Sequence, residues 1–355
     1  MALWLVRGGR TGEHEQKFFD DSRIYLTWSG ALQDVDLSNV KDYDEVKRIV
    51  AESYPTVSRG RVINHAGQIL AFAASMKSGD WIVLPRKGKP AIAFGEVVGP
   101  YTYSPSEPSP YAHWRAVKWL NQDVPRSAFD QDLLFSFGAF MTVCQISRND
   151  AEKRIRAMAQ GGWSSAPTFV APLGKSPAPS TEAAPEATVQ PEDSVDLERL
   201  ARDQIAKLIT RRFKGHEMAT LVEAVLKAQG YTTFKSPPGA DKGVDILAAP
   251  GALGFGKPRI CVQVKSQDAP VDTPTLNQLI GTMQNMHAEQ GLLVAWGGWK
   301  SSVEREVANQ FFRVRLWDQD ALIEEILKHY DALDADLRVE LPLKRIWTVA
   351  QDEED

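Results

Sequence analysis

Two segments set the fold class: Gly243-Val244-Asp245-Ile246-Leu247 and, beginning 18 residues after Asp245, Gln263-Val264-Lys265. Asp245 is the polar member of a strand-like run that otherwise consists of Val, Ile, Leu and Ala. Gln263 and Lys265 are two residues apart, so on a strand they point to the same face. If the two segments pair as a hairpin, the three side chains converge.

A carboxylate, a carboxamide oxygen and an ammonium group at one point suit metal-assisted hydrolysis of a phosphodiester. Asp245 and the Gln263 oxygen would offer hard oxygen ligands to Mg²⁺, with Mn²⁺ as a substitute. Lys265 would orient or deprotonate the attacking water. The alternative is that the three residues are structural, but ionisable groups inside central strands are costly unless they have a task. The sequence therefore predicts a catalytic site at Asp245, Gln263 and Lys265.

Outward from these segments, helical and strand patterns alternate. The expected elements are helices at 196–213 and 217–228, strands at 231–235, 244–248 and 259–265, a helix at 273–286, a strand at 291–296, a helix at 301–309, a strand at 313–317 and a helix at 318–328. Ser301 and Asp318 stand where helix N-caps belong. This order predicts an α+β or α/β domain, with a mixed sheet covered by helices.

Residues 213–327 resemble the catalytic domain of Mrr-type restriction endonucleases, within the PD-(D/E)xK nuclease superfamily. The resemblance rests on the following residues: Gly215-His216-Glu217, Ala228-Gln229-Gly230-Tyr231, Gly239 to Asp245, Cys261 to Lys265, Gly291 to Val294 and Lys300-Ser301-Ser302. It implies that Asp245 and Gln263 bind the metal and that Lys265 is the catalytic lysine. It also implies a DNA endonuclease that restricts foreign or modified DNA.

The first helix of this domain departs from the family pattern. Mrr-like domains usually carry a glutamate there, and the corresponding position is Ala219. Glu217 and Glu223 are the candidates to replace it as a metal ligand, and the alternative is that both are solvated. Asp241 is interpreted as a turn residue rather than a ligand. Gln278, on the helix after the lysine strand, can reach the site or the DNA backbone, or lie on a plain surface.

Residues 22–160 predict a different module, mainly β. Strand-like runs are expected at 22–29, 80–85, 91–98, 111–119 and 140–146, with helices at 44–52, 63–75 and 148–160. Short strands with interposed helices suggest a small, partly closed barrel. The early Trp28, the segment from Ser78 to Arg86 and the segment from Gly95 to Gly99 resemble the PUA-like superfamily, which includes EVE and YTH domains.

That resemblance implies recognition of a modified, flipped base. Trp28, Trp81 and Tyr101 could supply stacking faces, while Arg86 and Lys87, together with Arg59 and Arg61, could contact phosphates. The alternative for each aromatic residue is a place in the core of the barrel. The combined prediction is a module that senses a base, joined to a module that cuts.

Composition divides the chain into 1–163 for base recognition, a linker at 164–195, the nuclease at 196–330 and an acidic tail at 331–355. The linker holds six prolines, and the linker (−3) and tail (−5) carry more negative charge than the net −5 of the whole chain. Both modules are nearly neutral, which permits nucleic-acid binding without demonstrating it. Residues 341–347 of the tail either remain solvated or pack on the nuclease. Two cysteines exclude a disulfide framework, and no apolar run is long enough to span a membrane, so we expect a cytoplasmic protein.

The leading hypothesis is a Mg²⁺-dependent endonuclease that acts on double-stranded DNA, including DNA with modified cytosine, in antiviral defence. A homodimer or higher homo-oligomer is expected, because one such site cuts one strand. Two alternatives stay open: a nuclease activated by a small nucleotide bound to the first module, and a nucleic-acid-binding protein whose nuclease fold lacks catalysis.

Overall fold

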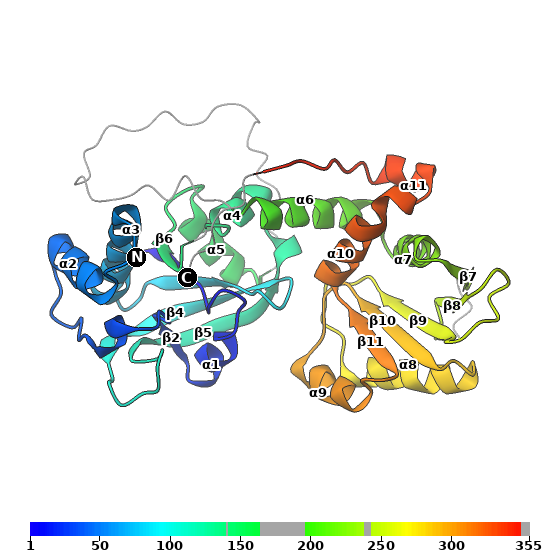
Figure 1. The fold of residues 1–355 in the computed structure, drawn as a ribbon, viewed down its shortest axis with the longest axis horizontal. Helices are drawn as coiled ribbons and strands as arrows, with labels where there is room; N and C mark the ends of the chain where they lie inside the picture. Colours follow the sequence, from blue (N-terminus) through cyan, green and yellow to red (C-terminus); the bar gives the residue numbers. More distant parts are fainter. Residues whose placement is uncertain (140, 164–195, 238–242, 349–355) are drawn as a thin grey trace. The chain divides into compact units, whose positions relative to one another are not determined.

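The computed structural model describes residues 1–139, 141–163, 196–237 and 243–348, which form two compact units, residues 1–200 and 201–349 (Figure 1). Each unit has its own sheet and its own hydrophobic clusters. The predicted linker at 164–195 and the last seven residues of the predicted tail lie outside the described residues. Within the described residues, no helix is both long enough and apolar enough to cross a membrane.

The N-terminal unit combines short strands with short helices. Its strands are β1 (Leu3–Val6), β2 (Arg23–Tyr25), β3 (Trp81–Pro85), β4 (Ala91–Tyr103), β5 (His113–Pro125) and β6 (Val143–Gln145). Its helices are α1 (Glu15–Asp20), α2 (Tyr43–Ser53), α3 (Arg59–Leu70), α4 (Gln131–Ser136) and α5 (Ala151–Gln160), and a π-helical turn follows α3 at Ala71–Ser75.

The six strands form one mixed sheet in the order β2-β5-β4-β3-β1-β6. One face packs against α1, α2 and α3, and the opposite face packs against α4 and α5. All five residues of β3 are buried, as expected for a strand covered on both faces. The edge strands β2 and β6 are not paired with each other, so the described residues form no closed barrel and the PUA-like part of the prediction is not confirmed.

Strand β1, the Leu-Trp-Leu-Val run at residues 3–6, was not predicted from the sequence. This strand lies inside the sheet, parallel to β3 and antiparallel to β6, and all four of its residues are buried. Asp80 holds the start of β1, because its carboxylate accepts hydrogen bonds from the Ala2 amide (2.7 Å) and from Trp4 Nε1 (3.0 Å). Four residues carry too little periodicity to indicate a strand, and only pairing with β3 and β6 reveals it.

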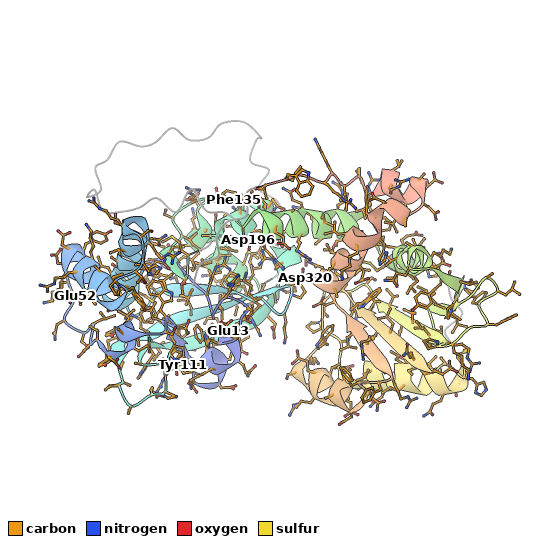
Figure 2. All side chains as sticks on the ribbon, in the orientation of Figure 1. Glu13, Glu52, Tyr111, Phe135, Asp196 and Asp320 are labelled. Atoms are coloured by element: carbon orange, nitrogen blue, oxygen red, sulfur yellow. The ribbon has the colours of Figure 1, made fainter. Side chains whose placement is uncertain are left out.

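Helix α1 is held against the sheet by an aromatic contact. Tyr111, labelled in Figure 2, precedes β5. Lys17 Nζ lies 4.8 Å from its ring centre, and His14 Nδ1 lies 2.9 Å from its hydroxyl. Phe18 and Phe19, on the same helix, are buried in the cluster that α1 shares with α2 and α3. These contacts place Glu15 of α1 close to the end of β3.

The second unit contains the elements expected around the nuclease motif. Its strands are β7 (Tyr231–Lys235), β8 (Ile246–Pro250), β9 (Ile260–Lys265), β10 (Gln290–Ala295) and β11 (Val314–Trp317). Its helices are α7 (His216–Ala228), α8 (Thr273–Asn285), α9 (Ser301–Asn309), α10 (Gln319–His329) and α11 (Ala335–Glu340), and α6 (Leu197–Arg212) spans the division between the two units.

The sheet order is β11-β10-β9-β8-β7, antiparallel from β7 to β9 and parallel from β9 to β11. Helices α8 and α9 pack on one face, while α6, α7 and α10 pack on the other (Figure 1). The predicted mixed sheet flanked by helices is confirmed. The predicted cap at Asp318 is also confirmed, since its side chain accepts from the Ala321 amide, but the cap at Ser301 was wrong because Lys300 takes that position without a side-chain bond.

The segment after α11 packs on this unit. Leu341 is fully buried, and its carbonyl accepts a hydrogen bond from the Tyr330 hydroxyl (2.7 Å). The Leu343 amide donates to the same hydroxyl (2.9 Å). Of the two interpretations of residues 341–347, packing therefore holds for the first part, whereas Ile346 and Trp347 are exposed.

Candidate active site

Asp245 lies directly before β8 and is fixed across the hairpin to β9. Its amide donates to the Val262 carbonyl (3.0 Å), and its carboxylate accepts from the Val264 amide (2.7 Å). Val264 is the residue between Gln263 and Lys265. The predicted hairpin therefore exists, and the Asp245 carboxylate is held at the backbone of the Gln-Val-Lys triplet.

The pairing of β9 with β10 shows which face the triplet uses. Gln263 and Lys265 are in register with Leu293 and Ala295, and both partners belong to the cluster formed with α8 and α9. The intervening Val264 instead packs with the cluster of α7 and α10. Gln263 and Lys265 therefore project together toward the α8 side, as their spacing predicted.

Gln263 has a buried oxygen that lacks a partner. The residue is 2% exposed, and its Oε1 has no hydrogen-bond partner among the described residues. Leaving a buried polar atom unpaired costs about 1–3 kcal/mol, so a group that would satisfy it is expected. A carboxamide oxygen beside the anionic Asp245 is what a hard divalent cation would bind.

These residues fit a magnesium ion that keeps part of its water shell. Among the described residues no group of three His, Cys, Asp or Glu side chains could hold a metal ion. Mg²⁺ does not need such a group, because it usually keeps several waters and takes only one or two carboxylates. Asp245 and Gln263 would be the side-chain ligands, with water and DNA phosphate oxygens completing the shell.

Cys261 lies on the same face of β9, two residues before Gln263. Burial, and secondarily the negative charge of Asp245, raises the pKa of this thiol to about 11. Burial likewise raises the pKa of Cys144 to about 11 in the other unit. Both cysteines are free and buried, and their thiols stay protonated near neutral pH.

Gln278 of α8 lies beside the chain that leads to Asp245. A Cβ built on Gly243 would come within 3.3 Å of Gln278 Nε2 and 3.0 Å of Thr282 Oγ1. Gly243 also has a φ of +72°, a conformation that L side chains rarely adopt. The turn before Asp245 therefore requires glycine, and it brings Gln278 to the neighbourhood of the site. Asp241 lies outside the described residues.

The candidate acids of α7 do not join Asp245 in the same way. Ala219 is buried in the cluster that contains Val262, so α7 covers the face opposite to Gln263. Glu223 accepts from Thr233 Oγ1 (2.8 Å) and pairs with Lys227 (3.1 Å), which commits it to β7 and to its own helix. Glu217 is exposed in the first turn of α7, and its role as a metal ligand stays a prediction.

The structure does not present Arg86 at the surface for the predicted phosphate contact. Arg86 is 9% exposed, and its Nε lies 2.6 Å from Glu15 Oε2, while its NH1 bonds Asp123 Oδ1 (2.9 Å). A buried guanidinium with two carboxylate partners is not presented to DNA. Lys87 donates its amide to Glu15 and has its Nζ 4.0 Å from Asp196 Oδ2, so its DNA contact stays a prediction.

The three aromatic residues predicted for a base pocket do not line one pocket. Trp28 and Tyr101 pack on the face of α1, α2 and α3, whereas Trp81 belongs to the cluster on the opposite face. Trp28 stacks on His65, with ring centres 4.5 Å apart, and Tyr101 bonds His113. Strand alternation explains this difference. Trp81 and Ile82 are neighbours in β3 and so point to opposite faces, and Ile82 takes the face of Trp28 and Tyr101.

The partner of Tyr101 makes stability depend on pH. His113 is fully buried, with Nδ1 2.6 Å from the Tyr101 hydroxyl and Nε2 3.0 Å from the Leu32 carbonyl, so the neutral ring uses both nitrogens. Burial lowers the pKa of His113 below 6.5, although the charge of Asp36 acts in the other direction.

We therefore expect the N-terminal unit to lose stability as the pH falls below about 6.5. In that range His113 binds a proton in the unfolded chain but stays neutral in the native state. Melting curves between pH 7.5 and 5 would check this. Burial also lowers the pKa of His65, so His113→Gln should flatten the slope only in part. A slope unchanged by His113→Gln would contradict the assignment.

Comparison with known proteins agrees with this geometry. Residues 210–326 match the model of a restriction endonuclease family, Mrr_cat, and residues 4–142 match a domain of unknown function, DUF8426. No curated protein matches the chain.

Two solved structures are similar at low identity. The DNA modification-dependent restriction endonuclease AspBHI is 14% identical, with 74% of this chain and 67% of that chain covered and a TM-score of 0.33. The MspJI restriction endonuclease, solved in complex with a 27-mer oligonucleotide, is 13% identical, with 91% and 74% covered and a TM-score of 0.31. Both TM-scores are too low to support an argument, so the assignment rests on the family match. Residues 210–326, within the C-terminal unit, therefore match a restriction endonuclease family of the Mrr type, and this match supports a DNA endonuclease activity.

Proposed function

We propose that the protein hydrolyses DNA phosphodiester bonds with Mg²⁺ held by Asp245 and Gln263, and that Lys265 positions the attacking water. The observation that carries this proposal is the buried, unpartnered Gln263 Oε1 next to a fixed carboxylate. In the structural alternative, this oxygen would have no hydrogen-bond partner among the described residues. A bound divalent ion would satisfy it.

The residues of the site have distinct tasks in this proposal. The Val264 amide holds one Asp245 oxygen, so the carboxylate is oriented before any substrate arrives. Lys265 is half-buried at the end of β9, where its ammonium can hold a water and offset charge that develops on the phosphate. The metal ion, when bound, supplies Lewis-acid polarisation of the phosphate oxygen. Gln278, which lies beside Gly243, would contact the DNA backbone.

Asp245→Asn is the sharpest test of the metal site. Asparagine can still accept from the Val264 amide, so the hairpin and the melting temperature should be kept. We expect Mg²⁺-dependent plasmid cleavage to fall by about 10²–10³-fold, because a fixed charge at the reacting centre is lost. Calorimetric titration with Mn²⁺ should show the matching loss of metal binding.

The control for this variant is Asp268→Asn, which removes an exposed carboxylate three residues after Lys265. It should leave both cleavage and Mn²⁺ binding unchanged. If Asp245→Asn cut DNA at the wild-type rate, the proposed metal site would be refuted. If the wild type neither cut DNA nor bound Mn²⁺, the catalytically silent alternative would replace this proposal.

We also propose that the N-terminal unit recognises a base in double-stranded DNA and that two copies of the chain act together to cut both strands. Matched plasmids, one unmodified and one with methylated or hydroxymethylated cytosine, test the recognition. We expect cutting to be confined to the modified plasmid. Equal cutting of both plasmids would refute recognition of a modified base. Cutting only after a small nucleotide is added would support activation by a ligand instead.

A further inference from the structure

The N-terminal unit has a cavity of about 350 Å³, open to solvent, between its sheet and α5. It lies on the face covered by α4 and α5, away from Trp28 and Tyr101. Its lining comprises Trp81, Leu120, Arg156, Ala159, Gln160 and Trp163. This volume is at the lower end of the range found for small-molecule sites, about 300–1,000 Å³.

Two indole rings and a guanidinium dominate the lining. The guanidinium of Arg156 lies over Trp81, 4.4 Å from its ring centre, and its Nε is held by Glu152 (2.7 Å). Trp163 stacks on Phe94 with ring centres 4.7 Å apart. The Trp163 amide also donates to the Met158 carbonyl (2.8 Å), so this ring is placed by the end of α5 as well as by packing.

Charged residues of both signs lie next to Trp81 on the sheet. Trp81 of β3 is in register with Glu96 of β4, which is in register with Lys118 of β5. Residues directly opposite each other on neighbouring strands point to the same face, with Cβ atoms about 4.5–5.5 Å apart. A carboxylate and an ammonium group therefore follow the indole in one row across the sheet.

We propose that this cavity binds a single nucleobase, carried either by extruded DNA or by a free nucleotide. The inference rests on the proposed role of the N-terminal unit in base recognition. Trp163 can stack on the face of a base, and Gln160 can bond its polar edge. Arg156 can meet a phosphate. Glu96 and Lys118, in the same row as Trp81 but outside the lining, add charge of both signs beside the cavity. An aliphatic ligand would use none of the charged groups, and a simple anion would use neither indole.

Binding is measured on the full chain in EDTA, so that no DNA is cut. One arm titrates dCMP, 5-methyl-dCMP and dAMP by calorimetry. The other arm uses duplexes that contain cytosine or 5-methylcytosine, followed by anisotropy, and a duplex with 2-aminopurine, whose fluorescence reports unstacking. Binding of the mononucleotides alone identifies a free nucleotide as the ligand, and binding of a duplex with unstacking identifies an extruded base.

Variants of the cavity decide the proposal. Trp163→Ala should weaken base binding by about 10–100-fold, because one stacking face is lost, and Trp163→Phe should restore most of it. Arg156→Gln tests the cavity without removing a ring. Its matched control is Lys153→Gln, an exposed lysine on the same helix that does not line the cavity. The expected result is weaker binding for Arg156→Gln, with Lys153→Gln equal to wild type.

Wild-type binding in Arg156→Gln and in a folded Trp163→Ala would overturn the proposal, as would the absence of binding to every probe. Mg²⁺-dependent plasmid cleavage by the wild type is measured separately. Cleavage without base binding overturns the cavity proposal and leaves the nuclease. Base binding without cleavage keeps the cavity and overturns the proposed nuclease reaction.

Discussion

Lys265→Ala is expected to lower the rate of DNA cleavage by about 10²–10⁴-fold, the range for removing a group that positions or transfers a proton. The fold should tolerate the change. The Lys265 carbonyl, not its side chain, accepts from the Trp296 amide (2.8 Å), and alanine would stand in register with Ala295. Single-turnover cleavage of a plasmid in Mg²⁺ measures the effect.

The control separates catalysis from loss of positive charge. Lys257→Ala removes an exposed lysine that precedes β9, at the end opposite to Lys265. It should cut at the wild-type rate, while both variants should bind DNA almost as well as the wild type in EDTA. Arginine at position 265 keeps the charge but differs in shape and cannot give up its proton, so Lys265→Arg should not restore the full rate. Cleavage by Lys265→Ala at the rate of Lys257→Ala would refute the role of this residue.

Arg86→Met is expected to destabilise the N-terminal unit by about 3–5 kcal/mol, because it leaves the buried carboxylate of Glu15 without its charged partner and with only the Lys87 amide as a donor. The two side chains are 9% and 6% exposed, and their charged atoms are 2.6 Å apart. The Arg86 guanidinium also lies 4.5 Å from the ring centre of Phe19. Urea unfolding of the full chain, followed by tryptophan fluorescence, measures the loss.

A double-mutant cycle distinguishes pairing from simple packing. Glu15→Gln combined with Arg86→Met should lose less stability than the sum of the single changes, since the unpaired buried charge disappears. Arg154→Met serves as the control, because Arg154 pairs with the more exposed Asp130 and Asp132 and should contribute at most about 1 kcal/mol. Equal losses for Arg86→Met and Arg154→Met would contradict the buried-pair argument.

The C-terminal unit was predictable because its signals are local. The runs at 231–235 and 301–309 coincide with β7 and α9, and the cap at Asp318 is present. The period of two placed Gln263 and Lys265 on one face before any pairing was known. The hairpin to Asp245 followed from the connection rich in glycine and proline at 249–258, which the sheet confirms.

The N-terminal unit was less predictable because its arrangement depends on distant contacts. The Leu-Trp-Leu-Val strand at residues 3–6 becomes visible only when it pairs between β3 and β6. From the sequence, Arg86 was predicted to be a surface cation. In the structure it pairs with Glu15, which lies 71 residues earlier in the chain. No sequence pattern marks Arg156 or Trp163 as binding residues, and the glycine pair at 161–162 indicates only the end of the helix. The cavity that they line was therefore not predicted.

By itself, the sequence determined the class of the second unit, the face on which Gln263 and Lys265 lie and the carboxylate that joins them, because strand period and turn composition act over a few residues. Only the tertiary structure decided that Gln263 Oε1 is buried with no partner in the described part of the chain, and that Trp81 faces away from Trp28 and Tyr101. It alone also decided that Arg86 belongs to an internal ion pair. Burial and pairing depend on residues tens of positions apart, and no local pattern encodes which of them meet.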